Sequence, residues 1–178
     1  FSIYKPQARS VNALMEFMSS RGMGPGEIKV LDWGCGRGRF VLWLREQGFN
    51  AYGVDVDPEP IQNGLPLFME KGYLGEPLSV IDVNGRTQYE DGYFDFIFTD
   101  NVIEHVKDLE LVVKEVSRLT SATGGGYHIF PAQRQFKEGH LFMPLVHWIP
   151  AGTVRKYLVG LFVTLGIEPH WEEVAALS

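Results

Sequence analysis

The sequence predicts an α/β fold in which a mostly parallel β-sheet lies between two layers of helices, a three-layer αβα arrangement. Short apolar runs rich in β-branched and aromatic residues alternate with helix-like segments, and this alternation is typical of a parallel sheet covered on both faces. A cluster of three glycines follows the first such run, where open parallel sheets bind ligands. The 178 residues, 45% of them hydrophobic, suit a single domain with a sizeable core.

The first part of the chain predicts one helix, followed by two strands with a second helix between them. Residues 8–21 are expected to be helical because four apolar side chains recur on one face: Val11, Leu14, Met15 and Met18. The run 28–33 is typical of a buried strand, and 39–48 is typical of a helix that stops at Gly48. Residues 50–57 are the second expected strand.

The second part of the chain continues the alternation. A helix can begin at Pro58, although Gly64 and Pro66 make it irregular. The remaining expected elements are a strand at 78–83, a strand at 93–100, a helix at 102–119 with a break near Lys107–Asp108, a glycine turn with a strand at 124–132, and a helix at 153–166. Residues 133–152 are rich in aromatic residues, His and Pro, and match no regular element.

The stretch "VLDWGCGRGRF" at 30–40 narrows the choice of ligand. A phosphate-binding P-loop needs Lys and then Ser or Thr after its last glycine, whereas Arg39 and Phe40 follow Gly38 here. A dinucleotide fingerprint, G-x-G-x-x-G, needs a third glycine where this chain has Arg39. The loop therefore excludes a P-loop and disfavours a nicotinamide-dependent oxidoreductase, which stays open as an alternative.

Three acidic residues, Asp32, Asp55 and Asp82, each close an expected strand. A carboxylate beside the glycine loop repels a pyrophosphate, but it attracts a ligand that carries an ammonium and a sulfonium. Asp55 can accept two hydrogen bonds from a ribose diol, and Asp82 is placed to meet an adenine amino group. Together the three acids favour a cationic adenosine ligand over an anionic one.

Five segments in this order resemble the class I S-adenosylmethionine-dependent methyltransferases. They are "VLDWGCGRGRF", "YGVDVDP", "VIDV", "YFDFIFTDNVIEHVKD" and "RLTSATGGGYHIFP", which together cover roughly Ile28 to Pro131. The resemblance implies a Rossmann-like methyltransferase fold with S-adenosylmethionine as the cofactor. Members usually finish with two more strands after the last helix, so we expect the C-terminal part of this chain to be truncated.

The resemblance also implies a role for each end of the strands. It implies that Gly34, Cys35 and Gly36 lie under the methionine and ribose of the cofactor and that Asp32 contacts its methionine end. Asp55 and Val56 would contact the ribose, and Asp82 and Val83 would flank the adenine. Thr99, Asp100 and Asn101 would surround the methyl group. The single domain of residues 1–178 then comprises an N-terminal helical lid (1–26), a cofactor-binding core (27–132) and an acceptor-side segment (133–178).

Several residues are candidates for the methyl acceptor. His105 opens a helix beside the methyl-transfer position and could act as a base, or could only fix the loop by hydrogen bonds. The acceptor-binding candidates are Tyr4 in the lid and His140, His147 and Trp148 in the irregular segment. No metal is expected, since Glu138, His140 and His147 match no standard zinc spacing.

Other polar and aromatic residues are expected to serve the structure. A small residue suits a tight loop, so Cys35 is not expected to be a nucleophile. We expect Asp91, Asp95 and Asp108 to stabilise turns and cap helices, and Trp33 and Phe40 to lie in the core.

Composition limits the partners. The chain has 16 basic and 22 acidic residues, so it lacks the basic excess that neutralises phosphates, and no nucleic acid is expected. One cysteine permits a cytoplasmic location. No apolar run is long enough to span a bilayer, although "HLFMPLVHWIP" could rest on a membrane or a partner subunit. The oligomeric state is not predicted.

The expected function is transfer of a methyl group from S-adenosylmethionine to a small-molecule acceptor or a glycan- or lipid-linked one. An alternative is a non-catalytic domain that binds S-adenosylmethionine as a regulatory module.

Overall fold

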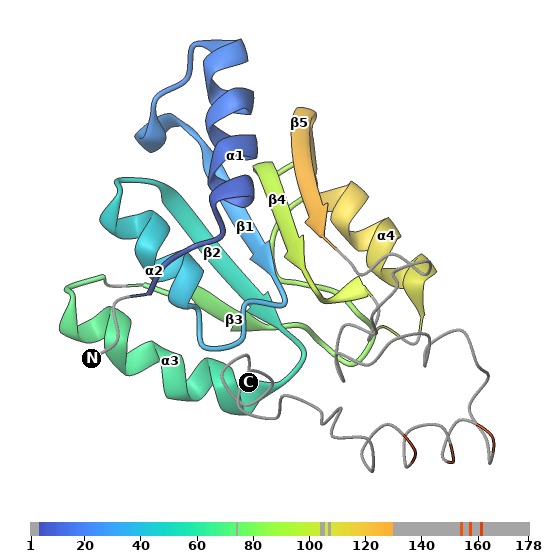
Figure 1. Cartoon of the computed structure of the whole chain (residues 1–178). Coiled ribbons are helices and arrows are strands. Elements are labelled where there is room, and N and C mark those ends of the chain that lie inside the picture. Colours follow the sequence, from blue (N-terminus) through green and yellow to red (C-terminus); the bar gives the residue numbers. More distant parts are fainter. Residues whose placement is uncertain are drawn as a thin grey trace. The chain divides into compact units, whose positions relative to one another are not determined.

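The computed structural model describes residues 4–73, 75–103, 106, 108–129, 154, 157 and 161. The chain divides into two compact units, Phe1–Phe130 and Pro131–Ser178. In the first unit, five parallel strands form one sheet in the order β3-β2-β1-β4-β5, and helices cover it (Figure 1). The expected α/β fold with a parallel sheet is therefore confirmed.

The elements follow the expected alternation. The strands are β1 (Lys29–Trp33), β2 (Asn50–Asp55), β3 (Leu78–Val80), β4 (Phe94–Asp100) and β5 (Thr120–Ile129). The helices are α1 (Ala8–Arg21), the short 3₁₀ helix η1 (Pro25–Glu27), α2 (Arg39–Glu46), α3 (Pro58–Glu70) and α4 (Leu109–Leu119). The helix expected at 153–166 lies mostly outside the described residues. The three residues of this range that the structure describes, Val154, Tyr157 and Leu161, are helical.

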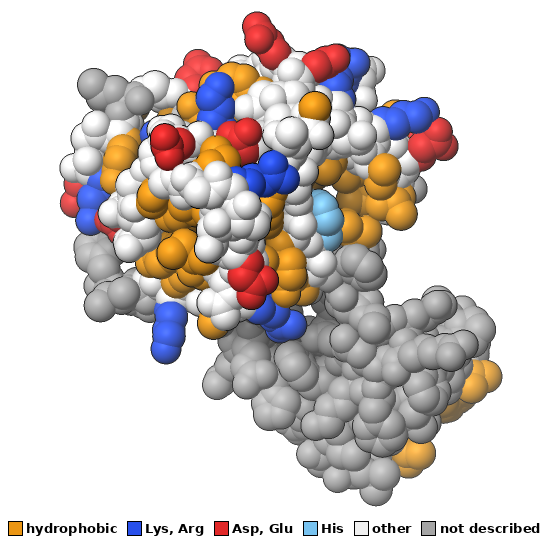
Figure 2. Space-filling view, turned by 90° about the horizontal axis from the view of Figure 1, so that it is seen from above, with side chains coloured by type: hydrophobic (Ala, Val, Ile, Leu, Met, Phe, Trp, Pro, Cys, Tyr) orange, Lys and Arg blue, Asp and Glu red, His pale blue; other side chains and the backbone are white. Residues whose placement is uncertain are grey.

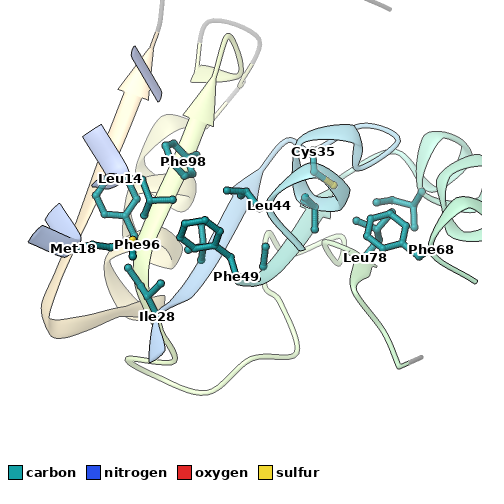
Figure 3. Packing of buried hydrophobic residues seen from close by; sticks show 14 residues of the cluster. Leu14, Met18, Ile28, Cys35, Leu44, Phe49, Phe68, Leu78, Phe96 and Phe98 are labelled. Atoms are coloured by element: carbon teal, nitrogen blue, oxygen red, sulfur yellow. The ribbon is translucent and has the colours of Figure 1, made fainter. Parts of the chain in front are cut away.

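The two faces of the sheet carry separate hydrophobic clusters. One cluster joins α1, α2 and α3 to the sheet, and Figure 3 shows Leu14 and Met18 beside Phe96 and, farther along, Phe68 beside Leu78. The other cluster packs Leu119 of α4 against Leu31, Trp33 and Ile97. Burying a Leu, Ile or Phe side chain fully stabilises the fold by roughly 1.5–3 kcal/mol. Trp33 lies in the core as expected.

The buried face of α1 differs in one residue from the predicted face. Met15 is 52% exposed, so its expected place in the core is wrong. Phe17 packs there instead, with its ring centre 4.9 Å from that of Phe96 on β4. Leu14 and Met18 are buried as predicted.

The glycines at 124–126 form part of a strand, so the expected turn at this position is wrong. Strand β5 begins at Thr120, directly after α4. A Cβ at Gly125 would lie 2.9 Å from the ring of Phe17, and a Cβ at Gly126 would lie 2.9 Å from the backbone oxygen of Ile97. The glycines therefore serve close packing, and they let α1 lie flat on β5.

Helix α4 is shorter than predicted because it begins after the expected break. Asp108 caps it by accepting a hydrogen bond from the backbone N–H of Leu111 (3.2 Å), which confirms its capping role. Asp95 accepts a hydrogen bond from the backbone N–H of Lys29 (2.9 Å). Asp91 lies 2.7 Å from Arg118 in an ion pair.

A buried ion pair fixes α4 to the loop before β4. Glu115 is 5% exposed, and its carboxylate accepts hydrogen bonds from Nη2 and Nε of Arg118 (2.6 and 2.8 Å) and from the backbone N–H of Thr87 (2.8 Å). Burial alone would raise the pKa of Glu115, but these hydrogen bonds outweigh it and lower the pKa to about 2. The ionised form is thus the stable one in the folded protein.

We expect Glu115→Gln to lower the free energy of unfolding by about 2–3 kcal/mol at neutral pH, because Arg118 loses a buried partner. Since the pKa is lowered on folding, the stabilisation is present above about pH 4.5 and is lost as the pH falls toward 2. Urea unfolding across this range measures the effect. Glu110→Gln, which removes an exposed pair with Lys114, is the control and should change stability by under about 0.5 kcal/mol.

Candidate functional site

The loop between β1 and α2 has a backbone that requires glycine. Gly34, Gly36 and Gly38 have φ values of 83°, 53° and 71°, a region that L-residues with a Cβ rarely adopt. A Cβ at Gly34 would also collide with the side chain of Val102. Backbone N–H groups of Gly34 and Cys35 both donate to the carbonyl of Val54 (2.8 and 3.0 Å), which fixes the loop to the end of β2.

Asp55 holds the same loop from the end of β2. Its Oδ2 accepts a hydrogen bond from the backbone N–H of Gly36 (2.8 Å), and its Oδ1 accepts one from the backbone N–H of Asp57 (3.0 Å). Asp57 in turn caps α3 through the N–H of Glu59 (2.9 Å). Each carboxylate oxygen has two lone pairs, so Asp55 can accept further hydrogen bonds from a ligand while it holds the loop.

Asp32 at the end of β1 is a buried acid with no compensating group. It is 7% exposed, and its carboxylate has no hydrogen bond or ion pair within the described ranges. Burial, together with the negative charges of Asp100 and Asp55, raises its pKa from 3.8 to about 7. The site therefore concentrates negative charge and offers a cationic group a place to bind.

A small hollow lies beside Asp32 at the carboxyl ends of the strands. Its lining residues come from the N-terminal segment, β1, α2, β4 and β5: Tyr4, Gln7, Ser10, Asp32, Phe40, Phe98, Thr99, Asp100, Tyr127 and Ile129. The ring of Tyr4 lies 6.4 Å from that of Phe40. Burial, then the charges of Asp32 and Asp100, raise the pKa of Tyr4 to about 12, so its hydroxyl stays protonated.

A long-range hydrogen bond joins the N-terminal segment to the end of β4. The side-chain amide of Gln7, the residue before α1, donates to Oδ2 of Asp100 (2.7 Å). Asn101 donates to the other oxygen of Asp100 (2.8 Å). Asn101 itself has a φ of 52°, and its backbone N–H donates to the carbonyl of Ile129 (2.9 Å).

Thr99 is bonded to the neighbouring strand. Its hydroxyl lies 3.0 Å from Nδ1 of His128 on β5, and its side chain is 1% exposed. Burial lowers the pKa of His128, so the neutral imidazole is favoured. Sequence reasoning did not identify His128 because only the strand pairing brings the two residues together.

The structure corrects one strand end. Strand β3 stops at Val80, so the expectation that Asp82 closes this strand is wrong. Asp82 lies instead in a turn, where its Oδ1 accepts hydrogen bonds from the backbone N–H groups of Asn84 and Arg86 (both 2.8 Å), and these lower its pKa. Val83 beside it is fully exposed and Val56 after β2 is 72% exposed, which leaves two apolar side chains open to a ligand.

Some of the other residues singled out in the sequence lie among the described residues, and some lie outside them. Cys35 is buried, and burial raises its thiol pKa, as expected for a structural residue. Phe40 packs against the core cluster, but it is only partly buried and also lines the hollow. His105, His140, His147 and Trp148 lie outside the described residues, and their roles stay predictions.

Sequence reasoning missed five of the hollow's lining residues, which come from the start of α1, from β4 and from the end of β5. These are Gln7, Ser10, Phe98, Tyr127 and Ile129. Their positions depend on the packing of α1 against β5, and no local sequence motif predicts this packing. The available signal was that Ser10 lies four residues before Leu14, one turn earlier on the same face of the helix.

Clustered metal-ligand side chains and long apolar helices are both absent from the part of the chain that the structure describes. There, His, Cys, Asp and Glu form no group suited to a metal ion, and none of the helices is both long and apolar enough to cross a membrane. On the described part of the face shown in Figure 2, basic and acidic side chains are interspersed.

Comparisons with known proteins agree with this geometry. A family model described as a methyltransferase domain matches residues 31–130. The ubiquinone biosynthesis O-methyltransferase of Pectobacterium carotovorum is 29% identical over 131 residues, which cover 71% of this chain and 52% of that protein. The chain thus spans about half the length of the curated relatives that it matches.

Two solved structures are similar to this chain. A protein of Pyrococcus horikoshii is 27% identical, with a TM-score of 0.54 over 71% of this chain and 60% of that one. A SAM dependent methyltransferase from Aquifex aeolicus, 20% identical, has a TM-score of 0.57 over 87% of this chain and 77% of that one, a likeness that supports the fold alone.

We expect Gly34→Ala to destabilise the protein by about 2–4 kcal/mol, because a left-handed φ and a collision with Val102 add together. Gly48→Ala is the matched control, since Gly48 has a similar φ of 88° but open space around its Cα. The control should lose only about 1–2 kcal/mol. Chemical unfolding of both variants measures the difference, and equal losses would show that contact with Val102 does not constrain the loop.

Proposed function

We propose that this chain, which belongs to the class I methyltransferase-domain family, binds S-adenosylmethionine at the carboxyl ends of β1–β4 and transfers its methyl group to a small-molecule acceptor. The observation that carries the proposal is the buried carboxylate of Asp32. It has no partner within the described ranges, and its pKa is raised to about 7. An ammonium at this position would supply the missing positive charge.

The residues present fit this cofactor. Asp32 would hold its ammonium group, and the backbone of Gly34 and Gly36 would lie beneath it without side chains in the way. Asp55 has lone pairs left for a ribose diol. The exposed side chains of Val56 and Val83 offer apolar contacts to an adenine ring.

When bound, S-adenosylmethionine supplies a methyl group on a positively charged sulfur, whose departure leaves a neutral thioether. The protein's part is then to position donor and acceptor in line, which can lower the barrier by several kcal/mol. Asp100 and Tyr4 line the hollow beside Asp32. The Gln7–Asp100 hydrogen bond ties the N-terminal segment to the end of β4 beside this place.

The names of the curated relatives favour oxygen as the acceptor atom. An oxygen acceptor must lose a proton, so O-methylation would need a base. His105 is the candidate that the sequence offers. A glycan- or lipid-linked acceptor is a narrower version of the same proposal, and residues 133–178 would be expected to contribute to its binding.

Titration calorimetry with S-adenosylmethionine tests the proposal. We expect binding at a ratio of one to one and a loss of about 10–100-fold in affinity for Asp55→Ala. Absence of binding in the parent protein would refute it. Binding of a nicotinamide dinucleotide instead would favour the oxidoreductase, and cofactor binding without methyl transfer to any acceptor would favour the regulatory module.

The substitution Asp32→Asn should separate stability from binding. Because folding raises the pKa of Asp32, the ionised carboxylate progressively destabilises the ligand-free protein as the pH rises from about 4 to 7, and fully above 7. The variant should therefore be more stable than the parent by about 1–4 kcal/mol at pH 8, yet bind S-adenosylmethionine about 10–100-fold more weakly.

Thermal unfolding and calorimetry at pH 5 to 8 measure both effects. The affinity of the parent should fall as Asp32 becomes protonated below about pH 7, and the affinity of Asp32→Asn should not follow this change. Asp57→Asn, in an exposed helix cap, is the control. A variant that loses stability at pH 8 would contradict the assignment of Asp32 as an uncompensated acid.

A further inference from the structure

Ser10 contributes a polar group to the hollow that the proposed cofactor contacts leave unused. It lies in the first turn of α1, is 4% exposed, and lines the hollow. Its hydroxyl has no hydrogen-bond partner in the described part of the chain. Fully enclosed unpartnered oxygens do occur there, at Ser79 and Tyr89, but Ser10 is not one of them. Its hydroxyl is therefore reached from the hollow.

Ser10 lies on the side of the hollow away from the proposed ribose and adenine contacts. Those contacts follow the ends of β1, β2 and β3, with Asp32 on β1 as the last of them. Helix α1, in contrast, packs over β4 and β5, where Phe17 meets Phe96 and Gly125. A ligand that contacts Ser10 would thus lie beyond the methionine end of the cofactor, where the acceptor must be.

The side chains around Ser10 select the charge of that ligand. Its neighbours in the lining are Gln7, Asp100, Phe98, Tyr127 and Ile129. The described lining contains no Lys, Arg or His, whereas it contains the carboxylates of Asp32 and Asp100. An anionic acceptor would be repelled, while a neutral molecule could place a ring against the aromatic side chains and a polar group at the hydroxyl.

We propose that Ser10 is a specificity residue that hydrogen-bonds a hydroxyl group of an uncharged, ring-bearing acceptor. This inference rests on the proposed function and extends it to the class of acceptor. The hydroxyl of Ser10 can donate or accept, and it gains a partner only when such a ligand is bound. A merely structural Ser10 would serve as a small side chain that lets α1 approach the sheet, and Ala would replace it without loss of binding.

Ligand-observed NMR titration of the full chain, saturated with S-adenosylhomocysteine, tests the proposal with two probes. Catechol is the neutral probe, and 3,4-dihydroxybenzoate carries the same hydroxyl groups on an anionic ring. We expect catechol to bind at least about 10-fold more tightly than the benzoate. Ser10→Ala should weaken catechol binding by about 5–20-fold and leave the affinity for S-adenosylhomocysteine within about twofold.

Ser19→Ala is the matched control, because Ser19 is exposed on the same helix. It should leave the binding of both probes unchanged. Three results would overturn the proposal while leaving the proposed function intact: catechol does not bind the loaded protein, Ser10→Ala binds it as tightly as the parent, or the benzoate binds equally well. Failure of S-adenosylhomocysteine to bind the parent would refute the proposed function itself, and this inference with it.

Discussion

The attachment of the glycine loop to the end of β2 is the constraint on which the rest of the site depends. The carbonyl of Val54 and the carboxylate of Asp55 accept hydrogen bonds from three backbone N–H groups of the loop, those of Gly34, Cys35 and Gly36. These bonds fix where β1 stops and where α2 starts. Asp32, one residue before the end of β1, is 7% exposed and lines the hollow beside this loop.

The same geometry opposes stability in the ligand-free state. Three acids, Asp32, Asp55 and Asp100, lie close enough that two of them raise the pKa of the third. Asp55 accepts hydrogen bonds from backbone N–H groups, and Asp100 accepts them from the side-chain amides of Gln7 and Asn101. Asp32 accepts none from the described residues. A fold that retains an uncompensated buried acid gains a strong preference for a cationic ligand.

Local patterns predicted the parts of the site that a few consecutive residues determine. The spacing of the glycines after Asp32 is one such feature, and the acid that closes β2, Asp55, is another. The end of β3 could not be predicted, because a hydrogen bond from the backbone N–H of Asp82 to the carbonyl of Arg86 (2.9 Å) closes a turn that the apolar run does not reveal. Gln7 and Ser10 were missed for a different reason. The Gln7–Asp100 bond joins residues 93 positions apart, and only the packing of α1 over β5 brings them together.

The division of the hollow explains why the donor can be inferred more readily than the acceptor. The proposed donor side consists of strand ends, of which Asp32, Thr99 and Asp100 line the hollow, and of the glycine loop beside them. The backbone positions of the strand ends follow from the sheet itself. The acceptor side depends on α1, held on the sheet through Phe17 and Gly125 and tied to β4 by Gln7. A change in the register of α1 would replace Ser10 and leave Asp32 and Asp55 in place. If the proposed function holds, acceptor choice would therefore change through one helix, while the proposed cofactor contacts, which the sheet determines, would stay the same.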